Sequence, residues 1–257
     1  MANTTKSTNW AGYAIHRPGV SFRQVSASWI QPSVTCVGGQ QSYSAVWVGL
    51  GGYDPVSGAL EQAGTEVDCN AAGGVTSSMW YELVPAPSKS ISPPVAPGDA
   101  IHATVTVTGH RVVFDLTNLT QHRHFHKSLY ASAVDVSSAE WIVEAPSACL
   151  SQFACQALPL ANFGTVTFGS VDAASTSGPA GTIVDSRWGR TKIRLTPGGQ
   201  RFIATANTGD LAAGTAAPSS LRSRGSTFDV TYAAVPVQSG RSFSSRQSLL
   251  RASYLKH

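Results

Sequence analysis

Hydrophobic and polar residues alternate over short stretches along most of the chain. Successive side chains of a β-strand point to opposite faces, so this alternation predicts strands that bury one face. No segment keeps a period of 3.6 residues over a dozen positions, and no long helix is expected. The expected strands are Phe22–Ile30, Tyr43–Leu50, Leu60–Val67, Ser77–Val84, Ile101–Thr108, Arg111–Leu116, His122–Leu129, Glu140–Glu144, Gly164–Phe168, Lys192–Leu195 and Thr227–Tyr232.

Turn-forming residues separate the expected strands. The sequence Thr108-Gly109-His110 lies between two alternating stretches and is typical of a tight hairpin. Pro93-Pro94 and Pro197-Gly198-Gly199 interrupt the chain elsewhere. Many short strands at regular spacing predict an all-β fold, either an antiparallel sandwich or a barrel.

The composition agrees with a folded β protein. The chain has 257 residues, of which 42% are hydrophobic and only 12% charged, against about 25% charged in ordinary domains. Such a chain can bury a large core, which excludes general disorder. No apolar stretch reaches the roughly 18 residues that a membrane-spanning helix needs, and no signal-peptide pattern follows Met1. We therefore expect no membrane partner.

Charge is distributed unevenly. Residues 1–180 have a balance of −4, whereas residues 181–257 have a balance of +8. The arginines of the basic part are scattered rather than clustered, so no nucleic-acid partner is expected.

The same distribution suggests a domain organisation. We expect an N-terminal arm over residues 1–6, a single domain over 7–233 and a basic tail over 234–257. An irregular insert is expected over about 172–226, because Asp172–Gly181 and Asn207–Ser226 have the composition of linkers.

The four cysteines are Cys36, Cys69, Cys149 and Cys155. An even number in a chain rich in Ser, Thr and Gly favours an oxidising compartment. A disulfide could close the short loop between Cys149 and Cys155, and Cys36 would then pair with Cys69 by elimination. Four buried free thiols are the alternative. No spacing typical of a zinc site is present, so no metal is expected.

Two of the expected strands carry polar residues that suggest chemistry. Glu140 and Glu144 share one face of their strand, whereas Glu61 and Gln62 point to opposite faces of another. An apolar strand rarely has two acids on its core side, so a concave surface with a Glu and an amide is predicted. The pattern alone does not say which of these groups act together.

Seven short motifs, in order, resemble the glutamic peptidases of the eqolisin family (peptidase family G1, formerly A4). Each motif is weak alone, but their order over about residues 7–170 is specific. They are Ser7–Gly12, Trp47–Gly49, Glu61–Gly64, Trp80–Glu82, Asn118–Thr120, Ala139–Glu144 and Ala161–Gly164.

The resemblance implies a fold and a mechanism. Eqolisins are antiparallel double-sheet β-sandwiches of the lectin-like jelly-roll type, with a cleft across one sheet. The motifs assign catalysis to Gln62 and Glu144. Glu144 would take a proton from an attacking water and return it to the leaving amine, while the Gln62 amide would stabilise the oxyanion. A carboxyl pKa near 4 would suit an acid-acting enzyme.

Further residues follow from the same motifs. Glu82, Trp47, Trp10 and Tyr81 are expected to bind substrate, and Glu140 is expected to support the catalytic pair through a hydrogen bond. The implied protein is a secreted monomer that cleaves proteins or peptides without a cofactor. The chain departs from the family pattern around Asp54 and after Glu82, so subsite shape is expected to differ.

Simpler interpretations stay open for each residue. Gln62 could cap a strand end, Glu144 could be a surface carboxylate, Glu82 could form a structural salt bridge, and the two Trp residues could be core. Two other function classes also remain. One is a lectin-like binding module without activity. The other is a glycosidase that uses Glu140 and Glu144, whose Cα atoms would lie about 6–7 Å apart on one strand.

Two further sequence patterns do not involve the expected catalytic residues. His122, His124 and His126 alternate on one expected strand, where an exposed edge is favoured over a metal site. Asn118–Thr120 is also a glycosylation sequon.

Overall fold

The computed structural model describes residues 3–92, 94–151, 154–196, 207–210, 214–235 and 255–256. Within these ranges the chain consists of strands, turns and loops, with one short 3₁₀ turn, η1 (Ser223–Gly225), and no α-helix. Accordingly, this part of the chain contains no helix that could span a membrane.

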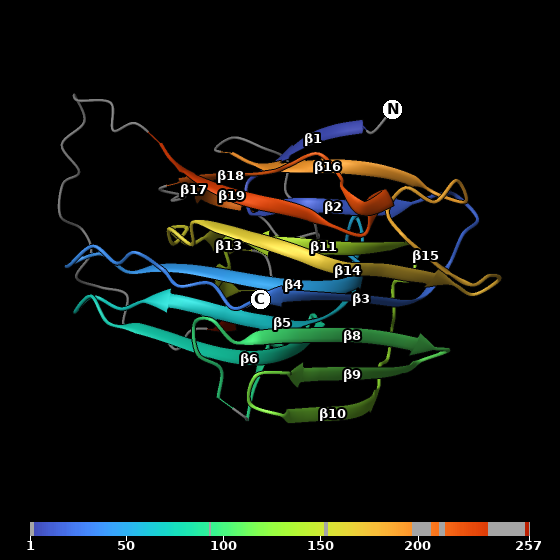
Figure 1. The fold of residues 1–257 in the computed structure, drawn as a ribbon, viewed down its shortest axis with the longest axis horizontal. Coiled ribbons are helices and arrows are strands. Elements are labelled where there is room, and N and C mark those ends of the chain that lie inside the picture. Colours follow the sequence, from blue (N-terminus) through green and yellow to red (C-terminus); the bar gives the residue numbers. More distant parts are fainter. Residues whose placement is uncertain are drawn as a thin grey trace.

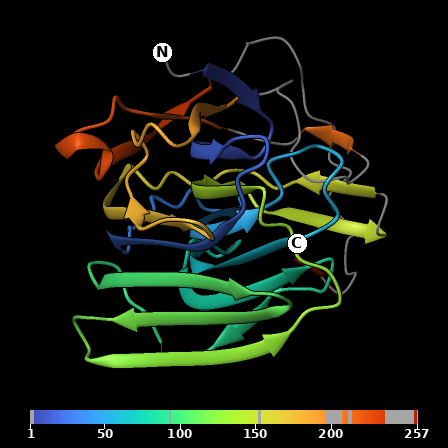
Figure 2. The ribbon, with the colours of Figure 1, turned by 90° about the vertical axis from the view of Figure 1, so that its right-hand side faces the viewer.

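The strands form two layers that pack face to face (Figures 1 and 2). In hydrogen-bonded order, the first layer contains β7 (Lys89–Ile91), β6 (Val75–Val84), β5 (Leu60–Cys69), β4 (Ser42–Gly51), β11 (Ser138–Glu144), β2 (Trp10–His16), β16 (Gly189–Leu195), β18 (Gly214–Pro218) and β19 (Phe228–Ala234). The second contains β14 (Thr165–Ser175), β3 (Phe22–Ile30), β8 (Ala100–Thr108), β9 (Arg111–Asn118) and β10 (Arg123–Tyr130).

One strand joins the two layers. The first part of β14, Thr165–Phe168, pairs with β19, and the part from Gly169 to Ser175 pairs with β3. At the start of the second part the register shifts between Gly169 and Asp172, and Ser170 has a positive φ of 50° there. A bulge of this kind bends a strand. The sheet therefore turns the corner and nearly closes, and the predicted antiparallel double-sheet sandwich is confirmed.

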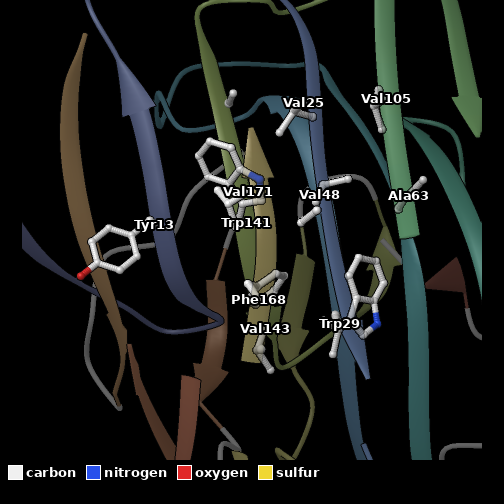
Figure 3. Close-up of a cluster of buried hydrophobic side chains, with 14 of the residues drawn as sticks. Tyr13, Val25, Trp29, Val48, Ala63, Val105, Trp141, Val143, Phe168 and Val171 are labelled. Carbon is white, nitrogen blue, oxygen red and sulfur yellow. The ribbon is translucent and has the colours of Figure 1, made fainter. Parts of the chain in front are cut away.

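The main core lies between the layers (Figure 3). Trp141 of β11 and Phe168 of β14 are fully buried in it, and the Trp141 indole N–H donates to the Ser26 carbonyl at 2.8 Å. A smaller apolar cluster covers the opposite face of the first layer and includes Trp10, Trp47 and Ile142. Strands β2, β4 and β11 are therefore buried on both faces.

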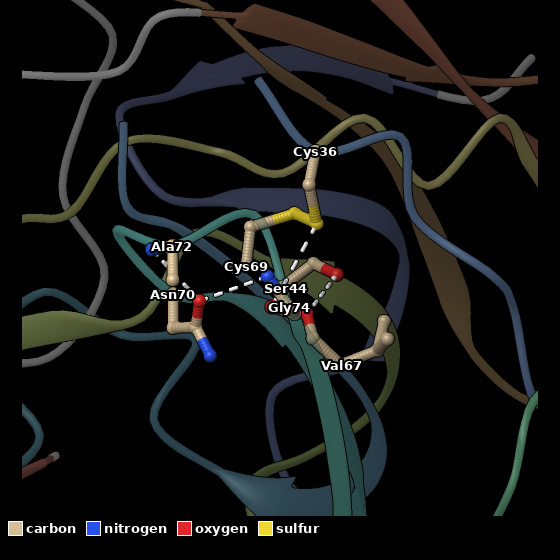
Figure 4. The surroundings of a disulfide bond; sticks show 7 residues. All are labelled: Cys36, Ser44, Val67, Cys69, Asn70, Ala72 and Gly74. Carbon is tan, nitrogen blue, oxygen red and sulfur yellow. Dashed lines mark hydrogen bonds between the residues drawn. A yellow bond between two sulfur atoms is a disulfide. The ribbon is translucent and has the colours of Figure 1, made fainter. Parts of the chain in front are cut away.

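A disulfide fastens the end of β5 to the loop after β3. Cys36 and Cys69 are joined, as predicted (Figure 4). Cys149 and Cys155 are backbone partners of the neighbouring strands β12 (Ser147–Ser151) and β13 (Ala154–Ala157). Their side chains lie outside the described residues, so the second disulfide stays a prediction.

The expected strands are present, most with ends shifted by a few residues, but several others were missed. β2 has no alternation because nearly all of its residues are buried. The linker predicted over Asp172–Gly181 is wrong, because β14 continues to Ser175 and β15 occupies Ala180–Gly181.

The predicted irregular segment Asn207–Ser226 contains β17 (Asn207–Asp210), β18 and η1. Their small residues do not distinguish an edge strand from a linker.

The structure describes most of the expected N-terminal arm but only a small part of the expected C-terminal tail. Within the expected arm, β1 (Asn3–Ser7) pairs in parallel with β16. Of the basic tail, the structure describes Ala234, Val235 and the short strand β20 (Leu255–Lys256), which pairs with β12. The rest of that predicted tail lies outside the described residues.

Candidate active site

The site is built on the outer face of the first layer, where β11, β4, β5 and β6 lie side by side. Register places Glu144, Ala45 and Glu66 in one cross-strand row. Gly49, Gln62 and Glu82 are cross-strand partners in a second row on the same three strands, β4, β5 and β6. Residues of one row share a face, and so do residues four apart on a strand.

Two small residues on this face leave room for larger neighbours. At Gly64 a Cβ atom would overlap the carbonyl oxygen of Val46 and come within 2.7 Å of the Trp47 Cβ. Glycine therefore lets β4 and β5 approach closely. In the row of Glu144, Ala45 contributes a single methyl group between the two acids.

A hollow with an empty volume of about 310 Å³, including space open to solvent, brings the expected catalytic pair together. Gln62, Glu82 and Glu144 line it, and they are only 3%, 2% and 7% exposed. The remaining lining residues are Ala45, Glu66, Trp80, Ser88 and Pro146. Carboxyl groups so deeply buried are unusual unless they are held by partners or kept neutral.

Glu144 is held by donors on both oxygens. The Asn9 side-chain amide donates to Oε1 at 3.0 Å, and the Trp47 indole N–H donates to Oε2 at 2.8 Å. Asn9 is itself positioned by Ser7, whose hydroxyl donates to Asn9 Oδ1 and accepts from the Trp10 backbone N–H, both at 3.0 Å. The orientation of the carboxyl group is therefore set by Trp47 on β4 together with the first residues of the domain.

Gln62 is held by Glu82. Its side-chain nitrogen donates to Glu82 Oε2 at 2.5 Å. Its Oε1 is buried and has no hydrogen-bond partner among the described residues. An amide nitrogen carries two hydrogens, so one N–H remains for another acceptor.

Burial raises the pKa of Glu144 to about 8. The Trp47 indole bond lowers this pKa, the charge of Glu82 raises it, and the bond from Asn9 lowers it. Desolvation outweighs the donors, so Glu144 is neutral throughout the acid range. This differs from the expectation of a carboxyl pKa near 4.

The predicted substrate-binding aromatics are placed differently from the expectation. Trp10 and Trp47 are buried with their rings edge to face at 5.0 Å, and Trp47 bonds Glu144. Tyr81 points to the opposite face of β6, where it stacks on Phe114 and Phe125. Tyr81 is therefore part of the core side and does not reach the pocket.

Glu140 does not make the expected supporting bond. It is fully buried, and its only neighbouring donor among the described residues is Ser138 of the same strand, whose hydroxyl lowers its pKa. Burial raises the pKa of Glu140 well above its ordinary value, because burial disfavours the charged form. Glu140 does not line the pocket.

The histidine strand is exposed at the edge of the second layer. His124 and His126 lie 3.2 and 2.7 Å from one oxygen of Asp115 on β9, an acid that is distant from them in the sequence and was not expected beside them. Among the residues described, no group of three or more potential ligands is arranged to hold a metal. The sequon is structural: Asn118 is fully buried and donates to Asp99 at 2.7 Å.

Three residues around the site were missed as functional candidates: Asn9, Glu66 and Trp80. All lie within or next to motifs that carried the family resemblance. Alternation could have found Glu66 and Trp80, because each lies an even number of residues from Gln62 or Glu82 on its strand.

Comparison with known proteins decides the family. The model of the peptidase A4 family matches residues 8–210. The chain belongs to this family. As a peptidase A4 protein it is a glutamic endopeptidase, a hydrolase of peptide bonds.

Solved structures agree with the family assignment. Scytalido-glutamic peptidase, in complex with a transition state analog inhibitor, is 25% identical with a TM-score of 0.64. SCP-B, an eqolisin in complex with the tripeptide Ala-Ile-His, is 24% identical with a TM-score of 0.59 and shows the fold. Each match covers 88% of this chain and 98% of the other. No curated protein sequence matches the chain significantly.

Proposed function

We propose that this peptidase A4 protein cleaves peptide bonds in acid with Glu144 and Gln62 as its catalytic residues. The observation that carries the proposal is their meeting in one hollow from strands that are not neighbours. Glu144 is a proton donor held on both oxygens, and Gln62 is an amide held by Glu82. General acid–base help and oxyanion stabilisation are the two contributions that amide hydrolysis needs.

The raised pKa of Glu144 suggests that the reaction begins with the neutral acid. Glu144 donates its proton to the scissile carbonyl oxygen while water attacks the carbonyl carbon. The water's proton then passes to the Glu144 carboxylate, which leaves a tetrahedral diol and restores the acid. This order differs from the expectation that Glu144 acts first as a base.

The second half of the reaction uses the same group. Glu144 donates its proton to the amide nitrogen, the C–N bond breaks, and a hydroxyl proton of the diol returns to Glu144. The second N–H of Gln62 donates to the former carbonyl oxygen throughout. The unpartnered Oε1 of Gln62 is a suitable acceptor for the attacking water.

Peptide or protein substrates and an extracellular location belong to the same proposal. Related structures contain a peptide-based transition state analog and a tripeptide. The Cys36–Cys69 disulfide suits an oxidising compartment.

The alternative classes have less support. Trp10, Trp47 and Trp80 are buried rather than exposed as a sugar-binding platform, and Glu140, the second acid of the glycosidase hypothesis, does not line the pocket.

Hydrolysis of an unfolded protein from pH 2 to pH 8 tests the catalytic pair. We expect Glu144→Gln to lower kcat by about 10²–10⁴-fold and Gln62→Ala by about 10²–10³-fold, with circular dichroism unchanged. His126→Gln, on the far layer, is the matched control and is expected to retain full activity. Folded variants that cleave as fast as the unchanged protein would refute the assignment.

A further inference from the structure

The second layer ends in an exposed strand that is rich in basic residues. β10 pairs with β9 on one side, and its other side is an edge of the sheet (Figure 1). Residues 100–130 contain three Lys or Arg residues, a single acid, Asp115, and five of the chain's seven histidines. These histidines are His102, His110, His122, His124 and His126. The balance of this stretch is +2 with neutral histidines and +7 when all five are protonated.

Asp115 holds two of the histidines in a fixed arrangement on the outer face of the layer, which is the face turned away from the core. One oxygen of Asp115 lies 3.2 Å from Nε2 of His124 and 2.7 Å from Nδ1 of His126, and the two histidine side chains are about half exposed. Their ring centroids are 6.4 Å apart. The second nitrogen of each ring has no hydrogen-bond partner among the described residues. Two protonated rings with one carboxylate between them leave an excess of positive charge, which suits an anionic ligand.

The charge of this outer face depends on pH. Histidine gains its positive charge between pH 8 and pH 5. The other charged or titratable groups at outer positions of β8, β9 and β14 include His102, Arg111 and Asp172. Burial lowers the pKa of His102, so it gains its charge in stronger acid, and burial raises the pKa of Asp172, so this acid loses its charge more easily. Acidification therefore changes every titratable group of the face in the same direction, toward positive charge.

An aromatic ring lies at one end of the same face. Tyr130 is the last residue of β10, is 79% exposed, and stacks on His110 with ring centroids 5.6 Å apart. Hydroxyl groups occupy several of the other outer positions on β8, β9 and β10, namely those of Thr104, Thr106, Thr117 and Ser128. A flat aromatic ring and hydroxyl groups suit a sugar, whereas a membrane surface would require a row of exposed Leu, Phe or Trp side chains.

We propose that β10 and the outer face of β9 bind a polysaccharide with carboxylate groups in mild acid and release it near neutral pH. His124 and His126 pair with carboxylates of the polymer as they do with Asp115, and Tyr130 packs against a sugar ring. A carboxyl group stays ionised above about pH 4, so the two partners carry opposite charges between about pH 4 and pH 6. The catalytic hollow lies on the first layer, so this binding does not depend on the proposed function.

Binding to polygalacturonate at pH 5 and pH 7.5, with dextran as the uncharged reference, tests the surface. We expect Kd at pH 5 to be about 10-fold lower than at pH 7.5, and binding to be lost in 1 M salt. His124→Gln combined with His126→Gln should weaken binding about 10-fold at pH 5 and change it less than 2-fold at pH 7.5. The matched control is Lys6→Gln combined with Lys89→Gln, which removes two exposed positive charges from β1 and β7 and should change neither Kd by more than 2-fold.

Two results would overturn the surface itself. One is equal affinity at both pH values, and the other is a double histidine variant that binds like the unchanged protein. The basic residues would then serve only to protect a sheet edge against pairing with another strand. Vesicles that contain phosphatidylserine test the class of partner, because tighter binding to them than to polygalacturonate would contradict a polysaccharide. A protein that binds polygalacturonate at pH 5 but cleaves no peptide supports this surface and refutes only the proposed function.

Poly-glutamate separates the contribution of the sugar ring from that of the charge. It has carboxylates without sugar rings, so we expect it to bind about 5-fold more weakly than polygalacturonate at pH 5. Tyr130→Ala should remove this difference and leave poly-glutamate binding and the unfolding temperature unchanged, because the ring is exposed. Val56→Ala, at a side chain that is 82% exposed between β4 and β5, is the control and should keep the preference. A Tyr130→Ala variant that still prefers polygalacturonate would overturn the role of Tyr130.

Discussion

A single proton on Glu144 links its burial to the pH dependence of the reaction. Burial raises the pKa of this carboxyl group to about 8, and the proposed mechanism needs the neutral form. We therefore expect kcat/KM to fall as the pH rises through about 8, because the acid loses its proton there. Peptide hydrolysis measured from pH 3 to pH 9 checks this. A rate that increases across the same range would show that the carboxylate acts as the base.

Glu82 affects both the orientation of Gln62 and the pKa of Glu144. Its negative charge raises the pKa of Glu144, so Glu82→Gln should move the fall in kcat/KM to lower pH. The new amide still offers an oxygen to the Gln62 nitrogen, and kcat in acid should stay within about 10-fold. Glu82→Ala removes that acceptor and should lose about 10²-fold more, with KM little changed. Identical pH profiles for all three proteins would contradict the coupling.

At the level of elements, the segment between β1 and β2 holds the carboxyl group of Glu144 in place. Asn9 donates to Glu144 and lowers its pKa. Asn9→Ala should therefore shift the fall in kcat/KM to higher pH, opposite to Glu82→Gln. Ser220→Ala, on the loop between β18 and β19, is a matched control that should not move the profile. A shift of Asn9→Ala to lower pH would contradict the assigned bond.

The same scale explains which elements the sequence predicts. β3 and β8 bury one face, and their alternation is visible. β2 lies between β11 and β16 with both faces covered, so its small and aromatic residues show no period. β18 is built from Gly, Thr, Ala and Pro, a composition shared with linkers. Alternation of hydrophobic and polar residues reveals a strand that is buried on one face. It does not reveal a strand that is covered on both faces or one whose side chains are small.

The candidate site needed information that no local pattern contains. Gln62 and Glu144 are brought together by the register of three strands, β5, β4 and β11. Alternation placed each on a face, but the pairing came from the family resemblance. Tyr81 shows the limit of that resemblance, since its motif is present while its ring faces the core. Motifs identify chemistry, whereas tertiary register decides which side chains share a pocket.

For the whole molecule, three buried acids connect stability to pH. Burial raises the pKa of Glu61 to about 9, that of Glu144 to about 8 and that of Glu140 well above its ordinary value. Between the ordinary Glu pKa of about 4.3 and these values, the folded state binds more protons than the unfolded state. The contribution of these three acids to stability is therefore greatest in acid and falls as the pH rises, by up to about 1.4 kcal/mol per pH unit for each group, whereas Asp135, whose pKa is lowered, acts in the opposite direction.

Thermal unfolding at pH 4 and pH 8 tests this dependence. We expect a lower unfolding temperature at pH 8, where folding must keep these acids protonated or bury their charge. Glu140→Gln replaces a fully buried acid with a neutral side chain of similar shape, so it should raise the unfolding temperature at pH 8 and change it little at pH 4. Asp115→Asn, at a partly exposed acid, is the matched control. An unfolding temperature that rises from pH 4 to pH 8, with no gain from Glu140→Gln, would mean that these acids are charged in the folded protein. In that case the neutral form of Glu144 could not be the acting one either, and the acid-first mechanism would be wrong along with the stability argument.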